Sequence, residues 1–163
     1  MARWSDIEAE AGDLAVRVKA LFDAHKHKTI ATLRKDGAPR ISGIEVTFAA
    51  GDMWFGGMPQ SLKCLDLLRD PRFALHSASV DPADGEDPSA WPGDAKVAGR
   101  AIEITDPDEI AKAMGDAEHP PGPFHLFRAE LTEMVLTKVG TPADHLTIES
   151  WHEGRGVRTR KRT

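Results

Sequence analysis

The segment from Met58 to Lys63 holds the residues best suited to binding an anion. Ser61 and Lys63 follow a Gly56-Gly57 pair, where a strand-like pattern gives way to a helical one. The first backbone N–H groups of a helix lack partners within the helix and attract anions. Here a hydroxyl and an ammonium group would stand beside them. The segment therefore predicts a phosphate site, and its ordinary alternative is a helix cap followed by an exposed lysine.

Two arginines are further candidates for an anion contact. Arg40 opens a strand-like run, so its side chain would either reach a neighbouring anion or point to solvent. Arg100 follows Gly99 in another strand-like run, and glycine inside a strand often marks the close approach of a second backbone. Residue types alone leave both alternatives open for Arg40.

The cysteine and histidine content favours neither a catalytic nor a metal site. The single cysteine, Cys64, excludes an internal disulfide and a Cys-rich zinc site. Its apolar neighbours at helical spacing predict a buried thiol. His25 and His27 stand beside lysines at a predicted helix end, as residues of a solvated patch do. The sequence contains no hydrolase nucleophile elbow, Walker loop or dinucleotide-binding glycine motif.

Two charged segments remain after these candidates. The C-terminal residues 155–163 contain five cations, whereas residues 81–94 are acidic and rich in proline and glycine. A solvated tail is the ordinary interpretation of such a basic end. The alternatives are that it closes over an anionic ligand or binds the acidic loop of a partner subunit. The long loop 81–94 is either functional or simply mobile.

The hydrophobic pattern predicts a mainly β framework for these candidates. Apolar residues at helical period predict a helix over 5–24, started by a capping box at Ser5–Glu8. A change of register between Leu131 and Met134 predicts a β-bulge. Short Gly-rich turns favour antiparallel pairing, hence one domain over 1–163 that forms a β-barrel with helices on its rim. We expect strands at 28–33, 40–48, 53–55, 73–80, 95–104, 124–139 and 145–151, and short helices at 61–68 and 106–117.

Composition narrows the function classes. The net charge of −5 opposes a nucleic-acid partner for the domain as a whole. No apolar run approaches the roughly 20 residues of a membrane helix. The N-terminal residues lack the apolar core of a signal peptide, which predicts a cytoplasmic protein.

The order of motifs along the chain resembles that of the pyridoxamine 5′-phosphate oxidase-like superfamily, which includes flavin and deazaflavin oxidoreductases. The resemblance covers roughly residues 20–158, and no single motif carries it. The motifs are Thr29–Arg40, Met53–Gly57, Ser61–Lys63 leading into Leu68–Arg72, Gly99–Ala101, Glu149–Trp151 and Gly154–Arg158.

This resemblance implies a six-stranded antiparallel split barrel of the FMN-binding type, working as a homodimer with the cofactor between subunits. The cofactor would be FMN or coenzyme F-420, a deazaflavin. Its phosphate would meet Ser61 and Lys63, and its ring would lie against residues 31–33 and 43–45. Because the cofactor supplies the hydride chemistry, no dedicated acid–base pair is expected. The residues implied to bind the cofactor are Thr32, Leu33, Arg40, Ser42, Gly43, Ser61 and Lys63.

Two departures from the oxidases proper favour the deazaflavin relatives. Leu62 replaces the arginine that follows the serine in those enzymes, and residues 158–161 copy their C-terminal arginine motif only loosely. The polyglutamate tail of coenzyme F-420 would also suit a basic C-terminus. We therefore expect a flavin- or deazaflavin-dependent oxidoreductase acting on a small organic substrate. The alternatives are a non-catalytic flavin- or haem-binding module of the same fold, and a structural or nucleic-acid-associated barrel without cofactor.

Overall fold

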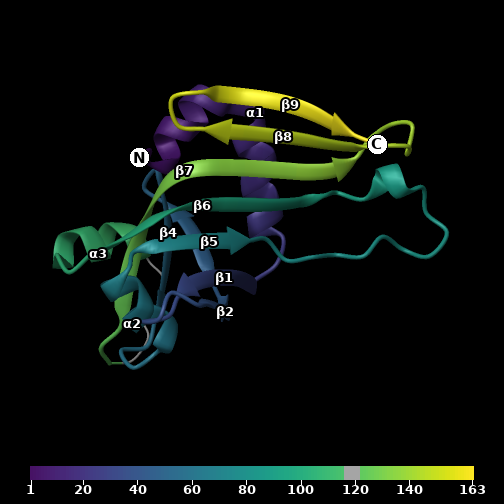
Figure 1. Ribbon diagram of the computed structural model, residues 1–163. Helices are drawn as coiled ribbons and strands as arrows, with labels where there is room; N and C mark the ends of the chain where they lie inside the picture. Colours follow the sequence, from purple (N-terminus) through teal and green to yellow (C-terminus); the bar gives the residue numbers. More distant parts are fainter. Residues whose placement is uncertain (116–121) are drawn as a thin grey trace.

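The computed structural model describes residues 1–115 and 122–163 and is mainly β (Figure 1). Within these residues, nine strands form one antiparallel sheet, in the order β2-β1-β5-β6-β7-β4-β3, with β8 and β9 added beyond β7. The elements are α1 (Trp4–Asp23), β1 (Lys28–Leu33), β2 (Pro39–Ile44), β3 (Val46–Ala49), β4 (Asp52–Gly57), α2 (Leu62–Arg69), β5 (Arg72–His76), the short 3₁₀ helix η1 (Pro88–Ala90), β6 (Asp94–Glu103), α3 (Pro107–Met114), β7 (His125–Val139), β8 (Leu146–His152) and β9 (Gly156–Arg162).

Strand β7 joins the barrel to its extension. Its first residues pair with β4, and its last seven pair with β8. Between these regions, Ala98 of β6 pairs with Glu133 while Gly99 pairs with Leu131, so Thr132 has no partner in the ladder. This is the expected bulge. It lets one long strand bend from the barrel into the flatter β7–β9 sheet.

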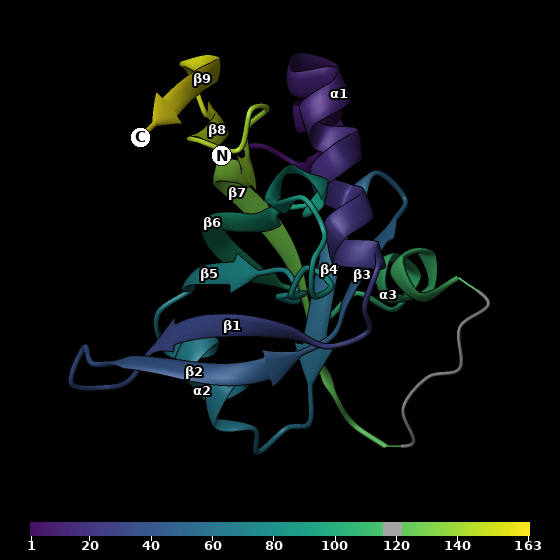
Figure 2. The ribbon, with the colours of Figure 1, turned by 90° about the vertical axis from the view of Figure 1, so that its right-hand side faces the viewer.

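Helix α1 packs its apolar stripe across one face of the sheet (Figure 2). Ile7, Val18 and Phe22 are fully buried there. The predicted helix is confirmed, but it begins at Trp4 and the predicted capping box is wrong. The backbone N–H of Ser5 donates to Gly51 O instead, and the carboxylate of Asp6 caps the helix start by accepting from the backbone N–H of Arg3 at 2.9 Å.

Two predicted elements differ in the structure. The expected strand 40–48 is two strands that separate at Glu45, because β2 pairs with β1 whereas β3 pairs with β4 across the barrel. The basic tail is strand β9, which pairs with β8 along its whole length through a turn with positive φ at Gly154 and Gly156. Alternating charged and small residues gave no apolar signal for this exposed edge strand.

The predicted fold class, an antiparallel split barrel with a few helices, is confirmed, although the strand count is higher than the expected six. Helix α3 accounts for most of the predicted helix 106–117, and positions 116 and 117 lie outside the described residues. The predicted strand 73–80 ends at His76. None of the described helices has the length and hydropathy needed to cross a membrane.

Candidate functional site

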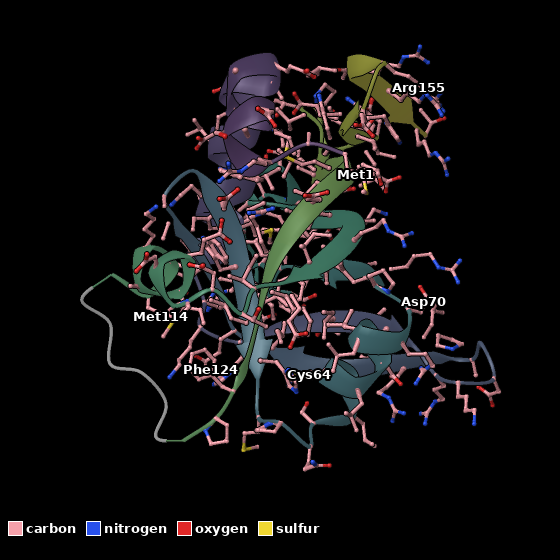
Figure 3. The ribbon with its side chains drawn as sticks, turned by 90° about the vertical axis from the view of Figure 1, so that its left-hand side faces the viewer. Met1, Cys64, Asp70, Met114, Phe124 and Arg155 are labelled. Atoms are coloured by element: carbon pink, nitrogen blue, oxygen red, sulfur yellow. The ribbon has the colours of Figure 1, made fainter. Side chains whose placement is uncertain are left out.

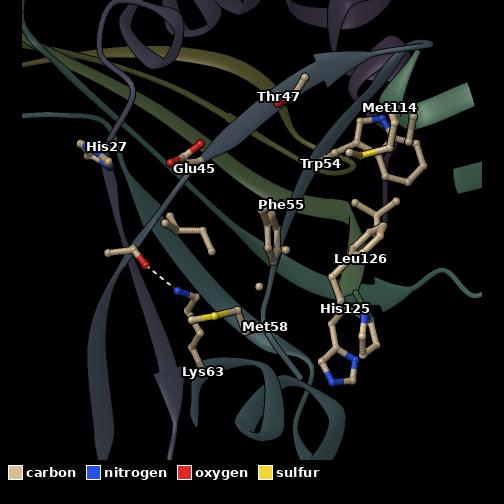
Figure 4. Close-up of a pocket in the computed structure, with 17 residues that line it drawn as sticks. His27, Glu45, Thr47, Trp54, Phe55, Met58, Lys63, Met114, His125 and Leu126 are labelled. Carbon is tan, nitrogen blue, oxygen red and sulfur yellow. Dashed lines mark hydrogen bonds between the residues drawn. The ribbon is translucent and has the colours of Figure 1, made fainter. Parts of the chain in front are cut away.

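A cavity of about 440 Å³ lies where β2, β3 and β4 meet the beginnings of α2 and β7 and the end of α3 (Figure 4). Its walls are largely apolar and aromatic. Such concave apolar sites with a few polar groups are typical of small-molecule binding. The apolar side chains in the wall are Ile44, Trp54, Phe55, Met58, Ala113, Met114, Pro123, Phe124 and Leu126, and the polar ones are His27, Glu45, Thr47, Lys63 and His125.

Gly56 and Gly57 at the end of β4 allow the close packing of this wall. A Cβ on Gly56 would lie 2.3 Å from the carbonyl oxygen of His125, and a Cβ on Gly57 would lie 2.8 Å from the Cys64 sulfur. Side chains larger than hydrogen would therefore push β4 away from β7 and α2. The glycine pair brings three elements together at the cavity.

Lys63 is the lysine that reaches into this cavity. Its Nζ donates a hydrogen bond to the carbonyl oxygen of Gly43 at 2.9 Å (Figure 4), which ties α2 to β2. An ammonium group has three N–H donors, so two remain for a ligand. Lys63 and Gly43, two residues implied to bind a cofactor, are thus brought together in one wall.

Ser61 stands at the start of α2 beside the same wall. Its backbone is extended, and its side chain does not cap the helix. Its hydroxyl oxygen lies 3.6 Å from where a Cβ of Gly57 would be. The same hydroxyl forms a hydrogen bond with the thiol of Cys64. Cys64 is buried as predicted, and burial raises the pKa of its thiol, which disfavours the reactive thiolate.

One turn further along α2, Asp66 gathers three side chains. Arg40 Nε donates to its Oδ2 at 2.7 Å, Thr32 Oγ1 donates to the same oxygen at 2.9 Å, and Arg69 Nη2 donates to Oδ1 at 2.9 Å. Burial by itself raises the pKa of the Asp66 carboxyl, but these hydrogen bonds outweigh it and hold that pKa below its ordinary value. We call Asp66, Thr32, Arg40 and Arg69 the Asp66 cluster.

The structure thus divides the sequence-predicted site residues into two groups. Gly43 and Lys63 line the cavity, with Ser61 next to it, whereas Thr32 and Arg40 belong to the Asp66 cluster. Of the others, Leu33 accepts a hydrogen bond from Arg69 through its carbonyl oxygen, and Ser42 neighbours Gly43 on β2 while pairing with Ile30 of β1.

His125 is a cavity residue that sequence reasoning missed. Its Nδ1 lies 2.7 Å from Glu103 Oε1, and its Nε2 lies 3.3 Å from the carbonyl oxygen of Pro59. It therefore links the loop before α2 to β6 and β7. Trp54 and Phe124 are two more cavity residues that the sequence did not reveal. Local periodicity indicates whether a residue is buried, but it does not indicate which residues form a cavity wall.

The basic C-terminal residues, which form β9 and the turn before it, line a second hollow of about 450 Å³ on the sheet face away from α1. Alternation along β9 places Arg158, Arg160 and Arg162 on that face, with Arg155 and Lys96 nearby. Figure 3 shows Arg155 at the opposite end of the molecule from Cys64 and Phe124. Attraction of a polyglutamate tail by these cations stays a prediction.

Within residues 1–115 and 122–163, no three His, Cys, Asp or Glu side chains are placed to hold a metal ion.

The family model described as pyridoxamine 5′-phosphate oxidase matches residues 14–138. No curated protein matches the chain by sequence.

Solved structures of low sequence identity share the fold. PhzG from Burkholderia lata 383, in complex with tetrahydrophenazine-1-carboxylic acid, is 15% identical with a TM-score of 0.63, over 98% of this chain and 95% of that one. A heme binding protein from Mycobacterium smegmatis is 18% identical with a TM-score of 0.59, over 91% and 87%. A pyridoxamine 5′-phosphate oxidase-related, FMN binding protein from Nostoc punctiforme is 12% identical with a TM-score of 0.58, over 100% and 98%.

Proposed function

Since the chain belongs to the pyridoxamine 5′-phosphate oxidase family, we propose that it binds FMN or coenzyme F-420 in the cavity beside Lys63 and acts as an oxidoreductase on a small organic molecule. A cytoplasmic location is part of this proposal. When bound, the cofactor supplies the hydride transfer, and the protein binds and orients it.

The observation that carries the proposal is the pairing of an aromatic wall with a cationic corner. Trp54, Phe55 and Phe124 offer apolar surface suited to a flat ring system. Lys63 offers two spare N–H donors beside the start of α2, where backbone N–H groups favour negative charge. A cofactor with a flat ring and a phosphate fits this combination.

Replacing Lys63 with alanine is expected to weaken cofactor binding about tenfold or more, because a hydrogen bond to a charged group contributes about 1.5–3 kcal/mol. The measurement is a titration with FMN and, separately, with coenzyme F-420, followed by tryptophan fluorescence. Trp54 lies in the cavity wall, so its emission reports on the site directly. The cofactor that binds with the lower Kd is the one we assign.

The matched control is Lys35→Ala, which removes an exposed lysine from the turn between β1 and β2. Its Kd should equal that of the wild type. If Lys63→Ala and Lys35→Ala bind equally well, the cofactor lies elsewhere. If the wild type binds neither cofactor, the proposal fails as a whole.

The second candidate is a haem-binding or cofactor-carrying module without catalysis. His27 is the observation in its favour, because this cavity histidine makes no hydrogen bond or ion pair with any described residue and an imidazole is a common haem ligand. A Soret band in the purified protein would support haem. The oxidoreductase would be supported if the protein increases the rate at which a small quinone oxidises the reduced cofactor.

We also propose that two copies associate, with the cofactor at their interface. Ile41 is 75% exposed on β2, and Met58 is 76% exposed just after β4. Both lie on segments that border the cavity, and a second subunit would remove them from water. We expect light scattering after gel filtration to give twice the 17.8 kDa chain mass. A single-chain mass at micromolar concentration would contradict this.

A further inference from the structure

Arg40 uses only part of its hydrogen-bonding capacity within the chain. Its side chain donates through Nε to Asp66, and no hydrogen bond from its two Nη atoms to a described residue is present. The side chain is 16% exposed. Among the described residues, Nε of Arg128 is the one side-chain nitrogen that is fully buried and lacks a hydrogen-bond partner. The unpartnered Nη atoms of Arg40 are therefore not fully buried, and solvent reaches them. Their four N–H donors are available to a ligand or to water.

The carboxylate that holds Arg40 is itself held firmly. Asp66 is 3% exposed, and each of its oxygens accepts at least one hydrogen bond from the described residues. Thr32 donates to the oxygen that also accepts from Arg40, while Arg69 donates to the other oxygen. These contacts prevent the carboxylate from turning, and so they fix the orientation of the guanidinium that it binds.

The same helix places Arg40 and Lys63 along one seam. Lys63 and Asp66 are three residues apart in α2, so they lie on neighbouring positions of one helix face. Lys63 contacts Gly43 of β2, and Asp66 contacts Arg40 of the same strand. Helix α2 packs against β1 and β4, and these two contacts join it to β2, so that the ammonium and guanidinium groups both lie between α2 and β2.

We propose that Asp66 is a positioning residue for the anionic group of the ligand: it holds Arg40 by Nε and leaves the Nη pair directed at the phosphate beside Lys63. This inference rests on the proposed function of the cavity. A guanidinium with two parallel N–H groups free matches an oxyanion better than an ammonium does. Thr32 and Arg69 act through Asp66 and keep its carboxylate in place.

The test compares the cofactor with its phosphate-free form, namely FMN with riboflavin or coenzyme F-420 with its deazaflavin riboside. The measured quantity is the ratio of the phosphate-free Kd to the cofactor Kd. Arg40→Lys keeps a cation for Asp66 but has no second pair of donors, so we expect this ratio to fall about fivefold or more. Asp66→Asn is expected to lower it about three- to tenfold, because the freed arginine must then be ordered by the ligand.

The double variant decides whether Asp66 acts through Arg40. If it does, Arg40→Lys with Asp66→Asn gives the ratio of Arg40→Lys alone, because sites that share one interaction are not additive. Additive effects would overturn the proposal. So would an unchanged ratio in Asp66→Asn with both ligands weakened equally, because that is the result of a purely structural role.

Asp70→Asn is the matched control, since Asp70 is also an aspartate of this region that binds an arginine, accepting from Nε and Nη2 of Arg72 just beyond α2. Its ratio should equal that of the wild type. Should Asp66→Asn fail to fold, Thr32→Val removes one of the donors to Asp66 while leaving every charge, and a wild-type ratio in that variant would overturn the proposal. Loss of binding in Lys63→Ala together with an intact ratio in Asp66→Asn would leave the proposed function standing and reject the positioning role alone.

Discussion

Replacing Asp66 with alanine is expected to lower the free energy of unfolding by about 3 kcal/mol. The carboxylate is almost fully buried and accepts hydrogen bonds from Thr32, Arg40 and Arg69. Breaking a buried ion pair by removing one partner typically costs about 3–5 kcal/mol, because the other charge stays buried without compensation. The lower end applies here, because Arg69 is 39% exposed and water can solvate it.

The same carboxylate makes this loss depend on pH. The pKa of Asp66 is lower in the folded protein than its ordinary value of 3.8. The stabilisation is therefore fully present above the ordinary pKa and is lost as the pH falls through the folded pKa. The difference between wild type and Asp66→Ala should be largest near neutral pH and should shrink below pH 4.

Urea unfolding at several pH values, followed by circular dichroism, measures both effects. Asp70→Ala is the comparison, because Asp70 belongs to an exposed pair with Arg72 and its removal should change stability much less. An Asp66→Ala variant as stable as Asp70→Ala at pH 7 would mean that solvent already screens the Asp66 cluster.

Replacing Gly56 with alanine is expected to destabilise the protein by about 3 kcal/mol, near the upper end of the cost of overpacking. The added Cβ would lie 2.3 Å from the backbone carbonyl oxygen of His125, and a backbone atom cannot move aside as a flexible side chain can. Strands β4 and β7 would have to separate at their pairing of Gly56 with Leu126. The cavity wall would widen at the same place.

Gly43→Ala is the control for this variant. A Cβ on Gly43 meets no atom within 4 Å, and its φ is not positive. Alanine in that strand position should change the unfolding free energy by less than about 1 kcal/mol in either direction. Equal midpoints of urea unfolding for Gly56→Ala and Gly43→Ala would show that β4 and β7 accommodate the methyl group.

Much of the fold is encoded in short-range patterns. The apolar stripe of α1, the strand 28–33 and the register change after Leu131 all appear in the structure where their periodicity predicts them. Cys64 is buried as its apolar neighbours indicated. Such features depend on residues two apart in a strand or three to four apart in a helix, whose side chains share a face whatever the rest of the chain does.

Those short-range patterns did not predict which distant side chains or strands contact one another. The arginine at position 40 was weighed between an anion contact and solvent, yet its Nε binds Asp66, 26 residues further along the chain. The break at Glu45 follows from β2 and β3 joining different neighbours. Strand β9 forms because β8 offers an unpaired edge, and its own sequence reads as a solvated tail.

By itself, the sequence determined the mainly antiparallel class, the helix that precedes the barrel and the phosphate-site candidates Ser61 and Lys63, because each arises from local periodicity or from the free backbone groups of a helix start. Only the tertiary structure decided that Lys63 meets Gly43 in an aromatic cavity, that His125 and Trp54 complete its wall, and that Asp66 takes hold of Arg40. These contacts join elements far apart in the chain, and their geometry is set by strand order and helix placement.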